Sequence, residues 1–234
     1  MLKATIWYLL RNYSRSYRYI PPLFTFLISL GLFYTYSPNP IMGSFSFTTM
    51  LIYIMAAWFS YSFLKTEHAV QEELTILHVK SRALYLIGLI CSVALIMCFI
   101  VVVAIVYPIV FDKFDEPIRF KHLIVGLFTH LSSALLGIAI SLYFAKRVER
   151  ASYAIGGILL ILALSFCQGA LIAKAGIAGA LLSWVFPPAY HTMNMLLNYS
   201  SYTMTSTVGT IGLSIGYAVL LMILLIQVLK RVEE

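Results

Sequence analysis

The 234-residue chain is 61% hydrophobic and only 11% charged, with a mean hydropathy of +0.91 and a formal net charge of +7. Soluble domains are about 45–50% apolar and about 25% charged. This composition excludes an ordinary soluble fold, because its core could not hide so much apolar surface from water. The charges fall in short clusters, and the stretches between them are long enough to cross about 30 Å of hydrocarbon. We therefore expect an all-α membrane protein.

The first segment, residues 2–19, mixes aromatic rings with the cations Lys3, Arg11, Arg15 and Arg18. It holds no apolar stretch that could span a bilayer. Alternating rings and cations suit a helix that lies in the headgroup layer. We predict such an interfacial helix, with an extended cytoplasmic tail as the alternative.

Six membrane spans are predicted, and none contains Asp, Glu, Lys or Arg. They are residues 20–36, 47–64, 83–111, 122–145, 151–173 and 210–229. Between the last two, residues 175–199 form two apolar stretches that Pro187-Pro188 divides, each too short to cross. We predict an extracellular re-entrant hairpin there. The alternative is one kinked full span, which would place the C-terminus outside.

The distribution of Lys and Arg decides the orientation. With six spans and a cytoplasmic N-terminus, the cytoplasmic side holds twelve of the 16 cations, and the outside keeps Lys113, Arg119, Lys121 and Lys174. This threefold bias is what the positive-inside rule predicts. Both termini are therefore expected in the cytoplasm, and the topology accounts for the net charge without a nucleic-acid partner.

Small residues four apart mark the expected packing faces, since lipid removes the hydrophobic drive between helices. These pairs are Ser133 with Gly137, Ser165 with Gly169, and Gly212 with Gly216. His130 is the histidine well inside a predicted span. A neutral interhelical hydrogen bond is the usual role of such a residue.

Several chemistries are missing from the sequence. The lack of ionisable residues in the spans disfavours a proton-coupled carrier and a channel built on charged rings. There is no HExxH, no GxSxG and no GxxxxGK[ST]. We expect no catalytic residue, no metal site and no cofactor in this chain, so that any ATP would be hydrolysed by another subunit.

The polar segment 65–82, KTEHAVQEELTILHVKSR, predicts an amphipathic cytoplasmic helix. Its apolar stripe is Val70, Leu74 and Leu77, at i, i+4 and i+7. With Thr66 as the cap, the acidic pair Glu72-Glu73 lies near the start of the helix, which complements the helix dipole. A surface helix resting on lipid is the alternative, although an acidic pair faces anionic lipid poorly.

The layout resembles the type-2 permeases of ATP-binding cassette exporters. The matching segments are LKATIWYLLRNYSRSYRY, TEHAVQEELTILHVKSR and AGIAGALLSWVFPPAYHTMNMLL. The resemblance implies that residues 65–82 form a coupling helix, which docks into a groove of the nucleotide-binding subunit. The contact residues it implies are Glu67, Gln71, Glu72, Glu73, Leu74 and Leu77.

The resemblance also implies a function. One transmembrane domain, residues 1–234, would pair with a second permease chain, identical or not, and with ATPase subunits that bind ATP and Mg. The compact length is similar to that of Gram-positive permeases that export, or confer immunity to, amphipathic peptides. Cargo would pass along the first, second and fifth spans, where the candidate pathway residues are Phe24, Phe26, Tyr53, Trp58, Phe59, Phe166 and Gln168. A secondary carrier, a membrane enzyme and an assembly subunit are the rival readings.

Overall fold

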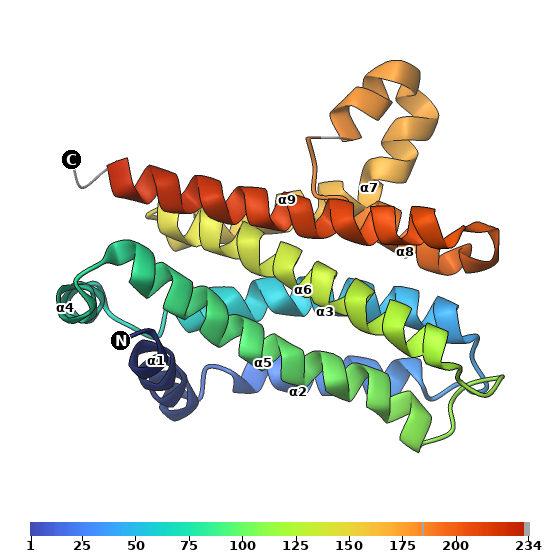
Figure 1. The fold of residues 1–234 in the computed structure, drawn as a ribbon, viewed down its shortest axis with the longest axis horizontal. Helices are drawn as coiled ribbons and strands as arrows, with labels where there is room; N and C mark the ends of the chain where they lie inside the picture. The colour runs from blue at the N-terminus through green and yellow to red at the C-terminus, as the bar shows by residue number, and fades with distance from the viewer. Residues whose placement is uncertain (184, 232–234) are drawn as a thin grey trace.

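The computed structural model describes residues 1–183 and 185–231, and this part of the chain is helical without a single strand. The helices are α1 (Leu2–Ser16), α2 (Ile20–Phe33), α3 (Ile41–Leu64), α4 (Ala69–Val79), α5 (Arg82–Val110), α6 (Phe120–Arg147), α7 (Ala151–Ser183), α8 (Ala189–Leu197) and α9 (Met204–Arg231). The long helices run side by side along the molecule, while α1 and α4 lie across one end of it (Figure 1). The chain is thus a helical bundle with two short helices capping one end.

Within the described ranges, five helices are long and apolar enough to cross a membrane: α3, α5, α6, the Ala151–Ala170 part of α7 and the Met204–Gln227 part of α9. The expected all-α membrane protein is therefore confirmed. The first predicted span differs, because α2 has only 14 residues. At 1.5 Å per residue it reaches about 21 Å, short of about 30 Å of hydrocarbon. Residues 34–36, which the prediction included, lie beyond the end of this helix.

The connection from α2 to α3 reaches the end of the bundle opposite α1 (Figure 1). There the Asn39 amide donates to the carbonyl oxygen of Lys113 at 3.0 Å, and the Asp115 amide donates to that of Asn39 at 3.0 Å. These bonds join the α2–α3 connection to the α5–α6 loop. The chain therefore travels the length of the bundle between α1 and α3, although α2 supplies only part of that distance.

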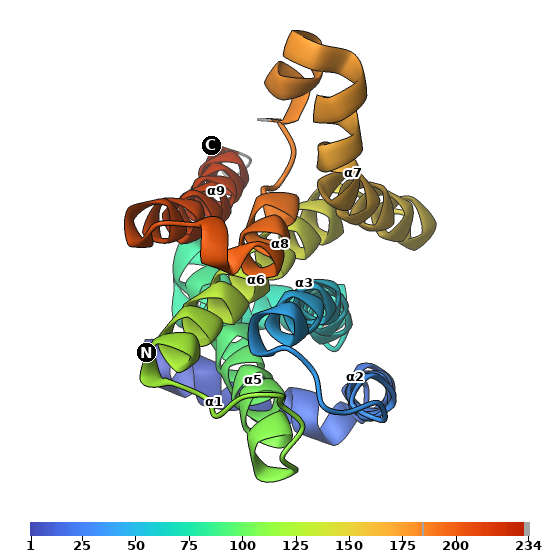
Figure 2. The ribbon, with the colours of Figure 1, turned by 90° about the vertical axis from the view of Figure 1, so that its right-hand side faces the viewer.

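Helix α6 lies in the middle of the bundle and contacts α3, α5, α7 and α9 (Figure 2). It packs tightly on α3 at Gly137, where a Cβ would overlap the carbonyl oxygen of Tyr53 and the side chain of Ala56. Nearby, the Oγ1 of Thr48 and the Nε2 of His130 are 2.8 Å apart, and both side chains are fully buried. The predicted interhelical role of His130 is confirmed.

The three predicted small-residue faces have different outcomes. Gly137 packs on α3 as described above. The Oγ of Ser165 lies 3.0 Å from the Tyr53 hydroxyl, and a Cβ on Gly169 would overlap the ring of Tyr190. By contrast, a Cβ on Gly212 or Gly216 would meet no atom of the described chain within 4 Å. The packing face predicted in the last span is therefore not used within this chain.

Two helices begin earlier than predicted. Helix α3 starts at Ile41, after the extended Pro40, and not at residue 47. Helix α9 starts at Met204 and not at residue 210, because the Oγ1 of Thr203 accepts the Ser206 amide as an N-terminal cap does. Polar residues occur at the start of both helices, so a search for apolar stretches places each start too late.

The predicted hairpin region contains a break and a short helix. Gly176 has φ 53° and ψ −129°, which interrupts α7 six residues after its membrane-spanning part ends. Such a positive φ favours glycine, because a side chain is strained there. Helix α8 follows Pro187-Pro188 and contacts α3, α7 and α9. Part of the predicted hairpin, residue 184, lies outside the described residues.

The close contact at Gly137 can be tested with Gly137→Ala. The added methyl group meets backbone that cannot move aside, so we expect a loss of about 1–3 kcal/mol, seen as a lower unfolding temperature in detergent. Gly156→Ala is the matched control, because nothing lies within 4 Å of the position of its Cβ. Equal unfolding temperatures for the two variants would contradict this account of the α3–α6 contact.

Candidate functional site

Helix α4 carries most of the predicted contact residues, and it joins the ends of α3 and α5. It begins at Ala69 with His68 in the N-cap position, so Thr66, taken as the cap above, lies outside the helix. The helix ends at Val79, and Lys80 after it has a left-handed backbone with φ 59°. The chain then turns directly into α5, where the Oγ of Ser81 accepts the Leu84 amide. Short connections on both sides fix α4 across the bundle.

The apolar residues of α4 divide into two sets. Ile76 and Val79 are buried against the bundle. The predicted stripe points away from it, since Val70, Leu74 and Leu77 are 74%, 54% and 70% exposed. We call these three residues the apolar ridge. The helix therefore presents leucine and valine outward, where a surface helix would normally present polar groups.

The acidic residues of this segment bind to the bundle. Glu72 forms an ion pair with Lys146 at the end of α6. Glu73 pairs with Arg82 at the start of α5, at 2.9 Å. Glu67 accepts a hydrogen bond from the Tyr85 hydroxyl at 2.5 Å. The carboxylates expected to contact another subunit therefore also bind α5 and α6 within this chain, and the Glu73 side chain stays 59% exposed.

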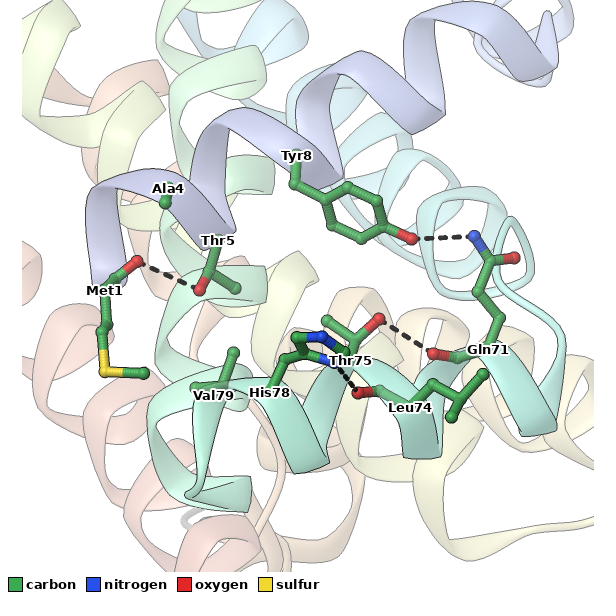
Figure 3. Close-up of a pocket in the computed structure, with 9 residues that line it drawn as sticks. All are labelled: Met1, Ala4, Thr5, Tyr8, Gln71, Leu74, Thr75, His78 and Val79. Atoms are coloured by element: carbon green, nitrogen blue, oxygen red, sulfur yellow. Dashed lines mark hydrogen bonds between the residues drawn. The ribbon is translucent and has the colours of Figure 1, made fainter.

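A groove of about 510 Å³ separates α4 from α1 (Figure 3). Its wall on α1 includes Ala4 and Tyr8, and its wall on α4 includes Leu74 and His78. The Gln71 side-chain amide donates to the Tyr8 hydroxyl at 2.8 Å, which bridges the two helices. One predicted contact residue, Gln71, therefore binds α1, while Leu74 belongs to both the groove and the apolar ridge.

Helix α1 packs on the bundle through its buried side. Thr5 lies against Gly88 of α5, and the Tyr13 hydroxyl lies 2.7 Å from the Oγ of Ser62. Burial raises the pKa of the Tyr13 phenol to about 12, against a smaller lowering by the Ser62 hydrogen bond. The phenol therefore stays protonated and can donate at neutral pH. The cations of α1, Lys3, Arg11 and Arg15, are exposed on its other side.

The predicted pathway residues do not form one surface. Phe26, Tyr53, Phe59 and Gln168 are buried inside the chain, while Phe24 and Trp58 are 58% and 41% exposed. Phe166 contacts the Tyr53 ring edge-on, with ring centroids 5.6 Å apart. Gln168 donates to the carbonyl oxygens of Phe186 and Pro187, which holds the turn before α8. Four of the seven therefore belong to the packing of the bundle.

Sequence reasoning missed Lys146, Tyr85 and Tyr8, which hold the acidic helix in place. Lys146 belongs to the cationic cluster after the predicted fourth span, and only its charge set it apart. Nothing in the sequence pairs it with Glu72, 74 positions away. Tyr85 and Tyr8 resemble the many other interfacial tyrosines of this chain.

The arrangement of the helices shows which class of protein this chain belongs to. Apolar helices long enough to cross a bilayer, with two helices lying across one end, make the chain a multi-pass membrane protein. Over residues 1–183 and 185–231, no three His, Cys, Asp or Glu side chains gather as a metal site needs. No family model matches the chain, and it matches neither a curated protein nor a solved structure.

The attachment of α4 to α6 can be tested by reversing a charge. Glu72→Lys places two cations together, and we expect a lower unfolding temperature in detergent. The double variant Glu72→Lys/Lys146→Glu restores an ion pair, so it should recover stability, with a coupling of about 0.5–3 kcal/mol in a double-mutant cycle. Additive losses in the double variant would show that the two residues do not interact.

Proposed function

We propose that this chain is the transmembrane permease subunit of an ATP-binding cassette exporter, and that a nucleotide-binding subunit docks on the apolar ridge of α4. The observation that carries this proposal is how the charged and the apolar side chains of α4 are used. Glu72 and Glu73 pair with cations of α6 and α5, and the three ridge residues are exposed at the end of the bundle. An outward apolar ridge on a firmly held helix is a typical surface for an α-helical contact with another protein.

The attachment of α4 also supports a role in transmitting movement. Its ion pairs join it to the start of α5 and the end of α6, and its chain connections join it to α3 and α5. A displacement of α4 by a partner therefore acts on three long helices at once. In the proposed mechanism, ATP-driven closure of two nucleotide-binding subunits moves α4 in each of two permease chains, and the bundles rotate to open a path outward.

The arrangement of cations supports cytoplasmic termini and six crossings. Helices α1 and α4, the α6–α7 junction and the end of α9 lie at one end of the bundle (Figure 1). The segments at this end carry twelve of the 16 cations, as the positive-inside rule requires of the cytoplasmic side. The stretch from α2 to residue 40 would supply the remaining crossing. The cytoplasmic membrane is the proposed location.

An amphipathic or hydrophobic molecule is the proposed cargo, with a cytolytic or antimicrobial peptide as the best candidate. No Asp, Glu, Lys or Arg is buried among the residues whose burial the structure describes, so nothing there would select a small ion by its charge. A role as a non-catalytic assembly subunit is the second candidate. The apolar ridge fits that role too, because it needs only a partner and no ATP.

Replacing two ridge residues tests the proposal. We expect Leu74→Ser/Leu77→Ser to lower vanadate-sensitive ATP hydrolysis in the complex purified through this chain by about tenfold, because each leucine loses an apolar contact worth about 1 kcal/mol or more. Val110→Ser/Phe120→Ser is the matched control, since these residues are 68% and 77% exposed at the opposite end of the bundle.

The result separates the two candidates. A stoichiometric ATP-hydrolysing chain that is lost only from the ridge variant supports the exporter. A stable partner without ATP hydrolysis would support the assembly subunit. Equal ATP hydrolysis in both variants would overturn the assignment of the ridge as the docking surface.

A further inference from the structure

A second groove, of about 760 Å³, runs along the half of α9 that lies nearer α8. Its floor is one face of α9, where the lining residues Ser206, Gly209, Leu213, Gly216 and Leu220 recur every three or four positions. At 1.5 Å per residue this face is about 21 Å long, which exceeds the roughly 15 Å of hydrocarbon in one leaflet. The groove is therefore long enough for a lipid-like molecule that lies along the helix.

The groove is open on one side. Leu220 is 56% exposed, and a Cβ on Gly209 or Gly216 would meet no atom of the described chain within 4 Å. The opposite wall comes from Ile172 of α7 and from Phe186, which precedes α8. Beyond its membrane-spanning part, α7 projects away from the bundle (Figures 1 and 2). Because α9 is long and apolar enough to cross a membrane, the opening faces lipid.

The polar groups of the groove gather toward the start of α9. They belong to Tyr202, Ser206, Thr210 and His191. The last of these lies deepest, because the next residue, Thr192, has its Oγ1 3.0 Å from the Oγ of Ser214, beside the middle of the floor. Deeper still, the lining is apolar except for Tyr217, whose hydroxyl already donates to the Val185 carbonyl oxygen at 2.7 Å. One end of the groove is therefore polar and the other apolar, as an amphiphile requires.

The polar end has unused capacity for hydrogen bonds. The hydroxyls of Ser206 and Thr210 each donate to a carbonyl oxygen of their own chain at 2.9 Å, so they can only accept from a ligand. The Tyr202 hydroxyl accepts from Asn194 at 3.3 Å and keeps its proton to donate. His191 makes no hydrogen bond with the described chain, and its neutral ring offers one donor and one acceptor. A group that both donates and accepts, such as a hydroxyl, fits this set.

The groove offers no charge to pair with an ionic head. None of its lining residues in the described chain is Asp, Glu, Lys or Arg. Burial lowers the pKa of the His191 ring below its usual value, so the ring is neutral at neutral pH. Lys174 is exposed two positions after Ile172 and therefore lies on another face of α7. A charged head would lose water here without gaining a counter-charge, which costs free energy.

We infer that this groove binds an uncharged amphiphile with a hydroxyl-bearing head, its head between Tyr202 and His191 and its apolar chain along Leu213 and Leu220. A second copy of this chain would fit less well. It would present the hydroxyls of its own Ser206 and Thr210, whose protons are already donated within its own helix, and would leave His191 without a partner. The inference does not depend on the proposed function and requires only that the bundle is embedded in a bilayer.

Photolabelling can locate this occupant. The protein is reconstituted into phosphatidylcholine nanodiscs with a trace of monooleoylglycerol that carries a diazirine at the end of its acyl chain, and labelled peptides are identified by mass spectrometry. We expect label on residues 209–220, because the chain lies there when the head is held at the polar end. Unlabelled monooleoylglycerol should displace this label better than methyl oleate or oleate, which share its tail, by about fivefold for each hydrogen bond that the competitor cannot make.

Filling the apolar end tests the position of the chain. Gly216→Leu places a side chain in the groove and should lower the labelling of residues 209–220 by about tenfold, because an already occupied space cannot take the acyl chain without strain. Gly156→Leu is the matched control, since it does not line the groove. Both glycines have no atom within 4 Å of the position of a Cβ, so both variants should fold.

Removing the hydroxyls tests the position of the head. Ser206→Ala/Thr210→Val should weaken displacement by monooleoylglycerol by about tenfold and leave displacement by methyl oleate unchanged, which also shows that the variant is folded. Thr205→Val is the matched control, because this threonine is exposed in the same turn of α9 and does not line the groove.

Two results would overturn the inference. Equal displacement by monooleoylglycerol, methyl oleate and oleate would show that the groove takes any acyl chain. Label on other spans but none on residues 209–220 would show that protein covers this face of α9, as a second copy of this chain would do.

Discussion

The close approach of α3 and α6 is the contact on which the rest of the bundle depends. Lipid tails are as apolar as leucine, so helices in a membrane are held by close packing and hydrogen bonds. Here Gly137 brings the two backbones together, and Thr48 meets His130 across the same interface. Helices α5, α7 and α9 then pack on α6. The register of α3 against α6 also sets where Lys146 meets the acidic helix.

The contacts of α4 show how a short helix can be both firmly held and exposed. Eleven residues are too few for stable isolated helicity in water. The burial of Ile76 and Val79 and the ion pairs to Lys146 and Arg82 attach the helix to the bundle. The apolar ridge stays exposed, because the ion pairs that attach the helix do not involve its residues.

The sequence predicted the membrane class because composition and spacing carry that information directly. The apolar stretches leading to α5 and α6 match those helices to within two residues at either end, since charges or proline stand there. The amphipathic α4 was also foreseen, from Val70, Leu74 and Leu77. Their orientation was not, because a helical stripe says which residues share a face and not which neighbour that face meets.

The less predictable parts depend on contacts distant in the chain. Glu72 and Lys146 meet because of the α3–α6 register. No local pattern in the sequence reveals that register. Thr203 begins α9 within a stretch of polar residues, and Ser46 is buried in α3 because its hydroxyl donates to the Met193 carbonyl oxygen. A hydropathy pattern counts such polar residues as loop. Their partners, found only in the folded chain, make them helical.

The brevity of α2 has a consequence for the bilayer around it. Irregular backbone is tolerated at membrane depth only where protein covers it. Residues 35–38, which follow α2, are exposed, so this segment belongs at the level of the headgroups and not in the hydrocarbon. Lipids beside α2 therefore meet a hydrophobic column several ångströms shorter than the one that α5 presents. Such a mismatch costs fractions of a kcal/mol per Å, so the membrane should thin on this flank and gather shorter-chain lipids there.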